Sequence, residues 1–155
     1  MEAIPSTPEQ ARLVELRRRR AELLESMRAV ERALAAPAPG RQERWAERVR
    51  LSLAELSADF RAHIDVTEGP DGLYADLRRT APRLSGAVER LTHEHATIAG
   101  VVDNLLADAS EPQTGEDVDK VRELGTALLA TLLRHRQRGS DLIYEAYETD
   151  IGGET

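Results

Sequence analysis

The sequence contains no cysteine among its 155 residues, which excludes disulfide bonds, thiolate metal sites, iron–sulfur clusters and a cysteine nucleophile. Aromatic residues make up only 3% of the chain, so a β-sheet core, which relies on them, is disfavoured. No apolar run approaches the roughly 20 residues that cross a bilayer, and the N-terminal segment has no hydrophobic signal core. We therefore expect a helical protein without membrane contact, and a cytoplasmic location fits this composition.

Lysine is nearly absent, because Lys120 is the only one and all other basic residues are arginines. The formal net charge is −7, with 28 acidic against 21 basic residues. A nucleic-acid surface needs a basic face to contact phosphates, so this balance predicts no nucleic-acid partner. The run of four arginines at 17–20 is better explained by solvated side chains, with Arg20 at the edge of the core.

What the chain does contain is four stretches with apolar residues at alternating spacings of three and four, the pattern of amphipathic helices. Capping and turn signals predict that they start at Thr7, near Arg41, near Pro82 and at Thr114. Breaks are expected at 36–40, 69–72 and 109–115, with a short helical piece at 73–79.

Short connections between four such helices favour an all-α fold, an antiparallel, up-down-up-down four-helix bundle. The expected organisation is a disordered N-terminus at 1–6, one bundle domain at 7–148 and a flexible tail at 149–155.

Three of the four histidines fall on these apolar stripes. His63, His95 and His135 each continue the three-four spacing of their neighbours, so each is expected to point inward. His93 lies about 200° around the helix from His95 and is expected to be exposed. Counting about 1.5 Å of rise per residue from the loops puts the three inward histidines at similar heights. Burying an imidazole without a partner costs free energy, and converging imidazoles most often share a metal.

Three motifs surround these histidines in chain order. They are HIDVTE at 63–68 followed by Leu73 and Tyr74, LTHEHATI at 91–98, and the single His135 on the last helix. In this order and spacing they resemble the hemerythrin family, the four-helix bundles that hold an oxo-bridged pair of iron ions. The resemblance covers roughly residues 14–147.

The resemblance implies a non-haem metal site, with iron as one or two ions, or zinc, and a small-molecule partner such as dioxygen or peroxide. The candidate ligands and substituting groups are His63, His95, His135, Glu68 and Asp141, with Arg20, Tyr74 and Tyr144 in addition.

The chain departs from the family pattern at several ligand positions. Arg20 stands where the first-helix histidine belongs, Thr67 stands at the usual carboxylate spacing on the second helix, and Gly139 stands at the carboxylate position of the last helix. On the third helix, neither Leu91 nor Ala99 can supply a second histidine.

Three interpretations follow from these departures. The first is one metal ion on three histidines, completed by a carboxylate or a tyrosine, which suits iron, zinc or another late first-row ion. The second is a rearranged di-iron site. The third is a metal-free bundle in which Arg20 pairs with Glu68 and the protein acts as an interaction or regulatory module. All three favour a binding or sensing protein over an enzyme.

Overall fold

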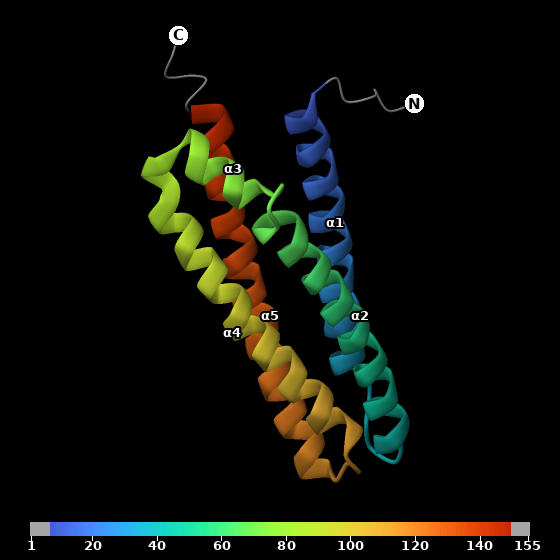
Figure 1. The fold of residues 1–155 in the computed structure, drawn as a ribbon. Coiled ribbons are helices and arrows are strands. Elements are labelled where there is room, and N and C mark those ends of the chain that lie inside the picture. The colour runs from blue at the N-terminus through green and yellow to red at the C-terminus, as the bar shows by residue number, and fades with distance from the viewer. Residues whose placement is uncertain (1–6, 150–155) are drawn as a thin grey trace.

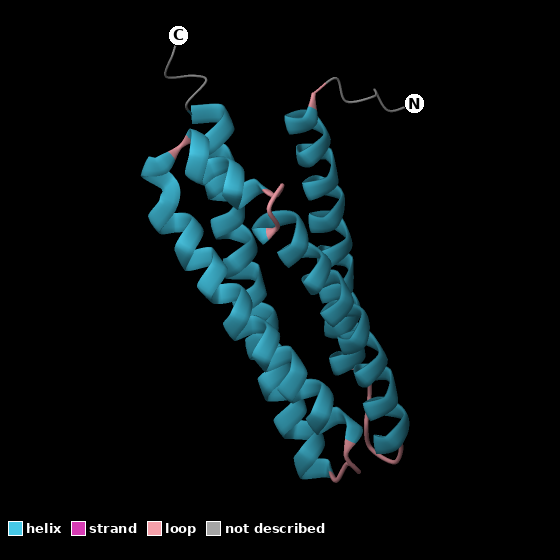
Figure 2. Cartoon of the chain, viewed as in Figure 1, coloured by secondary structure: helices cyan, strands magenta, loops and turns pink. Residues whose placement is uncertain are grey.

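The computed structural model describes residues 7–149, and apart from short connections this part of the chain is helical (Figures 1 and 2). The elements are four long helices, α1 (Pro8–Ala35), α2 (Gln42–Glu68), α4 (Ser85–Ser110) and α5 (Gly115–Ile143), together with a short α3 (Leu73–Thr80), a 3₁₀ turn η1 (Pro82–Leu84) and a π-helical segment η2 (Tyr144–Thr149). The predicted all-α fold with four helices is confirmed.

The expected ends at 1–6 and 149–155 lie outside the described residues, apart from Thr149, where η2 ends. None of the described helices is long and apolar enough to cross a membrane.

Local signals in the sequence explain where the helices begin and end. The Thr7 hydroxyl accepts a hydrogen bond from the Gln10 N–H at 3.0 Å, which caps α1. Thr114 and Asp117 form a capping box at the start of α5, with each side chain accepting from the other residue's N–H. The turn between α2 and α3 requires glycine at Gly72, because a Cβ there would lie 2.8 Å from the carbonyl oxygen of Thr67.

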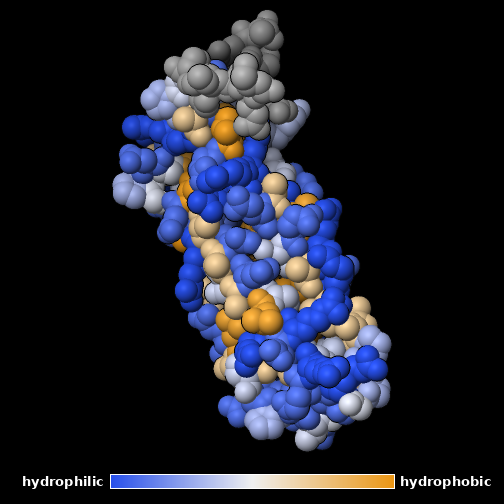
Figure 3. Space-filling model, turned by 90° about the vertical axis from the view of Figure 1, so that its right-hand side faces the viewer, coloured by the Kyte–Doolittle hydropathy of each residue, from blue (hydrophilic) through white to orange (hydrophobic). Residues whose placement is uncertain are grey.

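The long helices close a ring around a common core. Contacts join α1 to α2, α2 to α4, α4 to α5 and α5 back to α1. In Figure 1 the α1–α2 and α4–α5 connections lie at one end of the drawing, whereas α3 and the connection from α3 to α4 lie toward the other end. The outer surface is largely hydrophilic on the face drawn in Figure 3, with apolar residues scattered between charged ones.

Buried apolar side chains divide into two clusters along the bundle. The cluster nearer the α1–α2 and α4–α5 connections, which we call the loop-end core, includes Leu23, Trp45, Leu56, Phe60, Ile98 and Leu132. The cluster nearer α3, which we call the α3-end core, includes Leu16, Tyr74, Leu77, Leu91 and Leu142.

One polar residue on each long helix falls between the two cores in chain order. These residues are Arg20 on α1, His63 on α2, His95 on α4 and His135 on α5, and we call them the polar layer. All three histidines are buried, and Arg20 is half-buried. The site is therefore held at a level where all four helices contribute a side chain.

Candidate metal centre

The three histidines of the polar layer converge on one point inside the bundle. The ring centroids of His63 and His95 lie 5.0 Å apart, those of His95 and His135 lie 4.8 Å apart, and those of His63 and His135 lie 5.6 Å apart. Each residue offers one ring nitrogen to a set whose members all lie within 4.8 Å of one another. The side chains are 5%, 1% and 3% exposed, in chain order. The predicted convergence is confirmed, and His93 is exposed as expected.

Aromatic rings hold the imidazoles in place. Phe60 stacks on His63 with centroids 5.9 Å apart, and its ring meets His95 and His135 edge-on at 5.6 and 6.1 Å. Tyr74, which the sequence suggested as a substituting ligand, lies face to face with His95 at an interplanar angle of 12° and lines the cavity beside the cluster. These contacts restrict rotation of the three rings.

Two glutamates orient two of the histidines. The Nδ1 of His95 lies 2.5 Å from an oxygen of Glu68, and the Nδ1 of His135 lies 2.8 Å from an oxygen of Glu94. Arg138 donates a hydrogen bond to the other oxygen of Glu94 at 2.7 Å. Because an ionised carboxylate can only accept, each Nδ1 carries the proton, and the lone pair lies on Nε2. Carboxylates in this position orient metal-binding histidines and raise their basicity.

Glu68 was predicted as a direct ligand, and the structure shows it bonded to the far side of a histidine instead. Glu94 was part of the resembling motif but was not predicted as a site residue. The available signal was its position directly before His95, which turns its side chain about 100° from the stripe and toward a neighbouring helix.

Several ring nitrogens in the cluster have no hydrogen-bond partner. Within the described part of the chain these are both nitrogens of His63 and the Nε2 of His95. A buried polar atom left unpaired costs about 1–3 kcal/mol, so these unpaired nitrogens of His63 and His95 call for a ligand. Three imidazole nitrogens are a donor set that fits zinc or iron. These ring nitrogens lie within 4.8 Å of one another, so His63, His95 and His135 would hold one ion once the rings move closer together.

Burial keeps the three imidazoles neutral. It lowers the pKa of His63 from 6.5 to about 2, and the charges of the other two rings and of nearby arginines add to the effect. Burial also lowers the pKa of His95 and of His135, against the opposing effect of the bond that each makes to its glutamate. A neutral imidazole is the form that binds metal, so no proton has to leave these rings first.

Acidification is expected to destabilise the metal-free protein through these rings. As pH falls below 6.5, the unfolded chain takes up a proton at His63 while the folded chain does not until pH about 2. The contribution of His63 to the free energy of unfolding is therefore fully present above pH 6.5. Below pH 6.5 this contribution falls by about 1.4 kcal/mol per pH unit.

Urea denaturation of metal-free protein at pH 7 and at pH 5 measures this effect. The expected loss from His63 alone is about 2 kcal/mol, and His63→Leu should remove that part of the pH dependence. His93→Leu is the matched control, because that imidazole is exposed. An equal pH dependence in wild type and His63→Leu would show that His63 is not held neutral by burial.

Arg20 crosses from α1 to α5 instead of pairing with Glu68. Its Nη2 donates to the Ser140 hydroxyl at 2.5 Å and to the Arg136 carbonyl oxygen at 3.4 Å. Gly139 makes room for it, because a Cβ at that position would lie 2.9 Å from the Arg20 Nη1. The Arg20–Glu68 ion pair that the metal-free interpretation predicts is thus not formed. Gly139 in the middle of α5 is explained by its contact with the Arg20 side chain.

Asp141 and Tyr144 lie away from the cluster, which corrects the expectation that they complete the site. Both are exposed, and the Asp141 carboxylate accepts a hydrogen bond from Gln137 at 2.9 Å. At about 100° per residue, positions six and nine beyond His135 are turned about 120° and 180° from it around α5.

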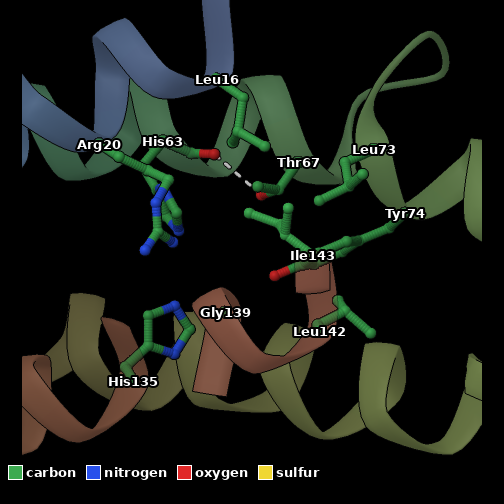
Figure 4. A pocket seen from close by; sticks show the side chains of 10 residues that line it. All are labelled: Leu16, Arg20, His63, Thr67, Leu73, Tyr74, His135, Gly139, Leu142 and Ile143. Atoms are coloured by element: carbon green, nitrogen blue, oxygen red, sulfur yellow. Dashed lines mark hydrogen bonds between the residues drawn. The ribbon is translucent and has the colours of Figure 1, made fainter. Parts of the chain in front are cut away.

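A small cavity lies beside the cluster. Its volume of about 10 Å³ is room for about one water molecule. Figure 4 shows its lining, with Arg20 and His63 projecting from α1 and α2 on one side and His135 from α5 on the other. The Tyr74 side chain closes the end toward α3.

Comparisons with protein-family models, with curated proteins and with solved structures find no match to this chain. The geometry and chemistry of the histidine cluster therefore carry the functional assignment.

Proposed function

We propose that this protein is a hemerythrin-like, antiparallel four-helix bundle that binds one non-haem metal ion through His63, His95 and His135. The observation that carries the proposal is the meeting of three buried, neutral imidazoles, among which both nitrogens of His63 and the Nε2 of His95 lack partners. Glu68 and Glu94 support the proposal, because each forms a hydrogen bond with the Nδ1 atom of one histidine, His95 or His135. The Nε2 atom of that histidine then carries the lone pair that can bind a metal ion.

A single ion fits the surroundings better than two. The positions on α1 and α5 that the family resemblance assigns to further ligands hold Arg20 and Gly139. The guanidinium of Arg20 lines the cavity beside His63 and His135, and its positive charge opposes a second cation there. Iron and zinc are the proposed ions, since both accept imidazole ligands.

The bound ion would supply an open coordination position and Lewis-acid or redox chemistry toward dioxygen or peroxide. The residues of the chain orient the ligands and exclude water. Glu68 and Glu94 orient the rings of His95 and His135. Phe60 packs against the rings of all three histidines. Leu16 and Leu142 line the cavity with apolar surface. This arrangement suits binding or redox sensing, in the cytoplasm, rather than turnover of a large substrate.

Metal titration of chelator-treated protein tests the proposal. We expect about one zinc, cobalt or ferrous ion per chain after gel filtration, measured by elemental mass spectrometry, together with a higher melting temperature. About two irons per chain would instead favour the rearranged di-iron site. No retained metal in a helical, cooperatively melting protein would overturn the proposal and favour the metal-free interaction module.

A further inference from the structure

The three histidines are almost closed to solvent, so a metal ion needs a path to them. Their side chains are 5%, 1% and 3% exposed, in chain order. The loop-end core lies on one side of the polar layer and the α3-end core on the other, and both consist of buried apolar side chains. A metal ion therefore reaches the ring nitrogens only when some element of the bundle moves.

The element whose movement costs least is α3. It spans eight residues, whereas the four long helices span 26 to 29 residues each. The break at 69–72 precedes it, and Ala81, with a φ of −140° and a ψ of 66°, ends it. A short helix between two breaks can move as a unit while the long helices keep their backbone hydrogen bonds.

α3 also covers the histidine cluster at its own end of the bundle. The ring of Tyr74 stacks on that of His95, with centroids 5.8 Å apart. Leu73 and Tyr74 both line the cavity beside the cluster, and Figure 4 shows them across it from Arg20 and His135. Movement of α3 away from the bundle would therefore uncover His95 and open the cavity.

A buried carboxylate on α3 holds this helix against two other elements. Asp76 is 7% exposed, and it pairs with Arg12 of α1 at 3.3 Å. The Tyr147 hydroxyl of η2 donates to the same carboxylate at 3.2 Å, and Arg79 of α3 itself donates to it at 2.6 Å. Hydrogen bonds to an ionised carboxylate are about twice as strong as those between neutral groups, so Asp76 fastens α3 to α1 and η2.

We propose that α3 is the gate through which a metal ion enters and leaves the three-histidine site, and that Asp76 is the latch that holds this gate shut. The inference rests on the proposed function and adds the route of exchange. The three proposed ligands lie on α2, α4 and α5, so opening of α3 leaves the ligand set in place. The rates of uptake and release are then both proportional to the small fraction of molecules in which α3 is open.

Stopped-flow measurement of cobalt(II) uptake, and of cobalt release to excess chelator, tests the proposal through the visible absorption of cobalt. Asp76→Asn keeps the size of the side chain and removes its charge, so α3 should open more often. Both rates are expected to rise by the same factor, at least about tenfold, while the equilibrium affinity for cobalt stays unchanged. Hydrogen exchange of the metal-free variant should be faster at the α3 amides and unchanged in the loop-end core.

Tyr147→Phe is a second variant, and it serves as the test if Asp76→Asn does not fold. It removes one hydrogen bond of the latch and keeps the contact between Asp76 and Arg12, so both rates should rise by a smaller common factor. Asp71→Asn is the matched control, because it removes the same charge from an exposed residue in the break before α3. Its rates should equal those of wild type.

The outcomes separate the gate from the metal site. Wild-type rates in both Asp76→Asn and Tyr147→Phe would overturn the gate and leave the metal site standing. Faster release without faster uptake would also overturn it, because Asp76 would then act on the hold of the ligands and not on access to them. Absence of cobalt uptake by wild type at equilibrium would overturn the proposed function, and the gate with it.

Discussion

His63→Ala is expected to reduce zinc affinity by more than the roughly 10–100-fold that loss of an outer hydrogen-bonding partner costs a metal site. His63 is one of only three proposed ligands, and neither of its ring nitrogens has another partner among the described residues. His93→Ala, which removes an exposed imidazole two residues from His95, should leave the affinity unchanged. Competition with a chromophoric chelator measures the zinc affinity of wild type, His63→Ala and His93→Ala.

A graded effect is expected at Glu68. Glu68→Gln keeps the size of the side chain but weakens the acceptor for the His95 N–H, so zinc affinity should fall by about 10–100-fold. Equal affinities in wild type, His63→Ala and Glu68→Gln would mean that zinc binds elsewhere on this acidic protein.

Phe60→Ala is expected to lower the free energy of unfolding by about 3–5 kcal/mol, the usual cost of emptying a buried aromatic site. Phe60 is 2% exposed, belongs to the loop-end core and contacts all three histidine rings. Its removal leaves a cavity directly under the cluster, so the imidazoles lose both packing and orientation.

Urea denaturation of metal-free protein at pH 7 measures this effect. Leu51→Ala is the control on the same helix, because Leu51 is 59% exposed and its truncation should change stability by less than about 0.5 kcal/mol. The loss of unfolding free energy in Phe60→Leu should lie between the losses in Phe60→Ala and Leu51→Ala. A loss below about 1 kcal/mol for Phe60→Ala would indicate that the rings close over the vacated space.

The sequence allowed the helices and the convergence of the histidines to be predicted, for physical reasons. Helix ends depend on local chemistry, such as the Thr114 cap and the close backbone at Gly72, and local chemistry is visible in a single chain. The inward direction of His63 follows from its spacing to Phe60 and the leucines before it.

Partners across helices were harder to predict. Glu94 reaches His135 on another helix, and the spacing along one helix does not report the rotation of its neighbour. The direction of Arg20 depends on space left by Gly139, which lies 119 residues further along the chain. The prediction that Asp141 completes the site is not met, because a position close to His135 in sequence does not place the two side chains on one face of α5.

The polar layer also separates the loop-end core from the α3-end core. Apolar contacts are continuous within the loop-end core and within the α3-end core, but the boundary between them consists of rings with unpaired atoms and one arginine. Without a ligand, we expect local opening of the α3-end core to cost less free energy than global unfolding, as partial unfolding follows such boundaries. A metal ion would tie α2, α4 and α5 together at this boundary and make the two halves unfold as one.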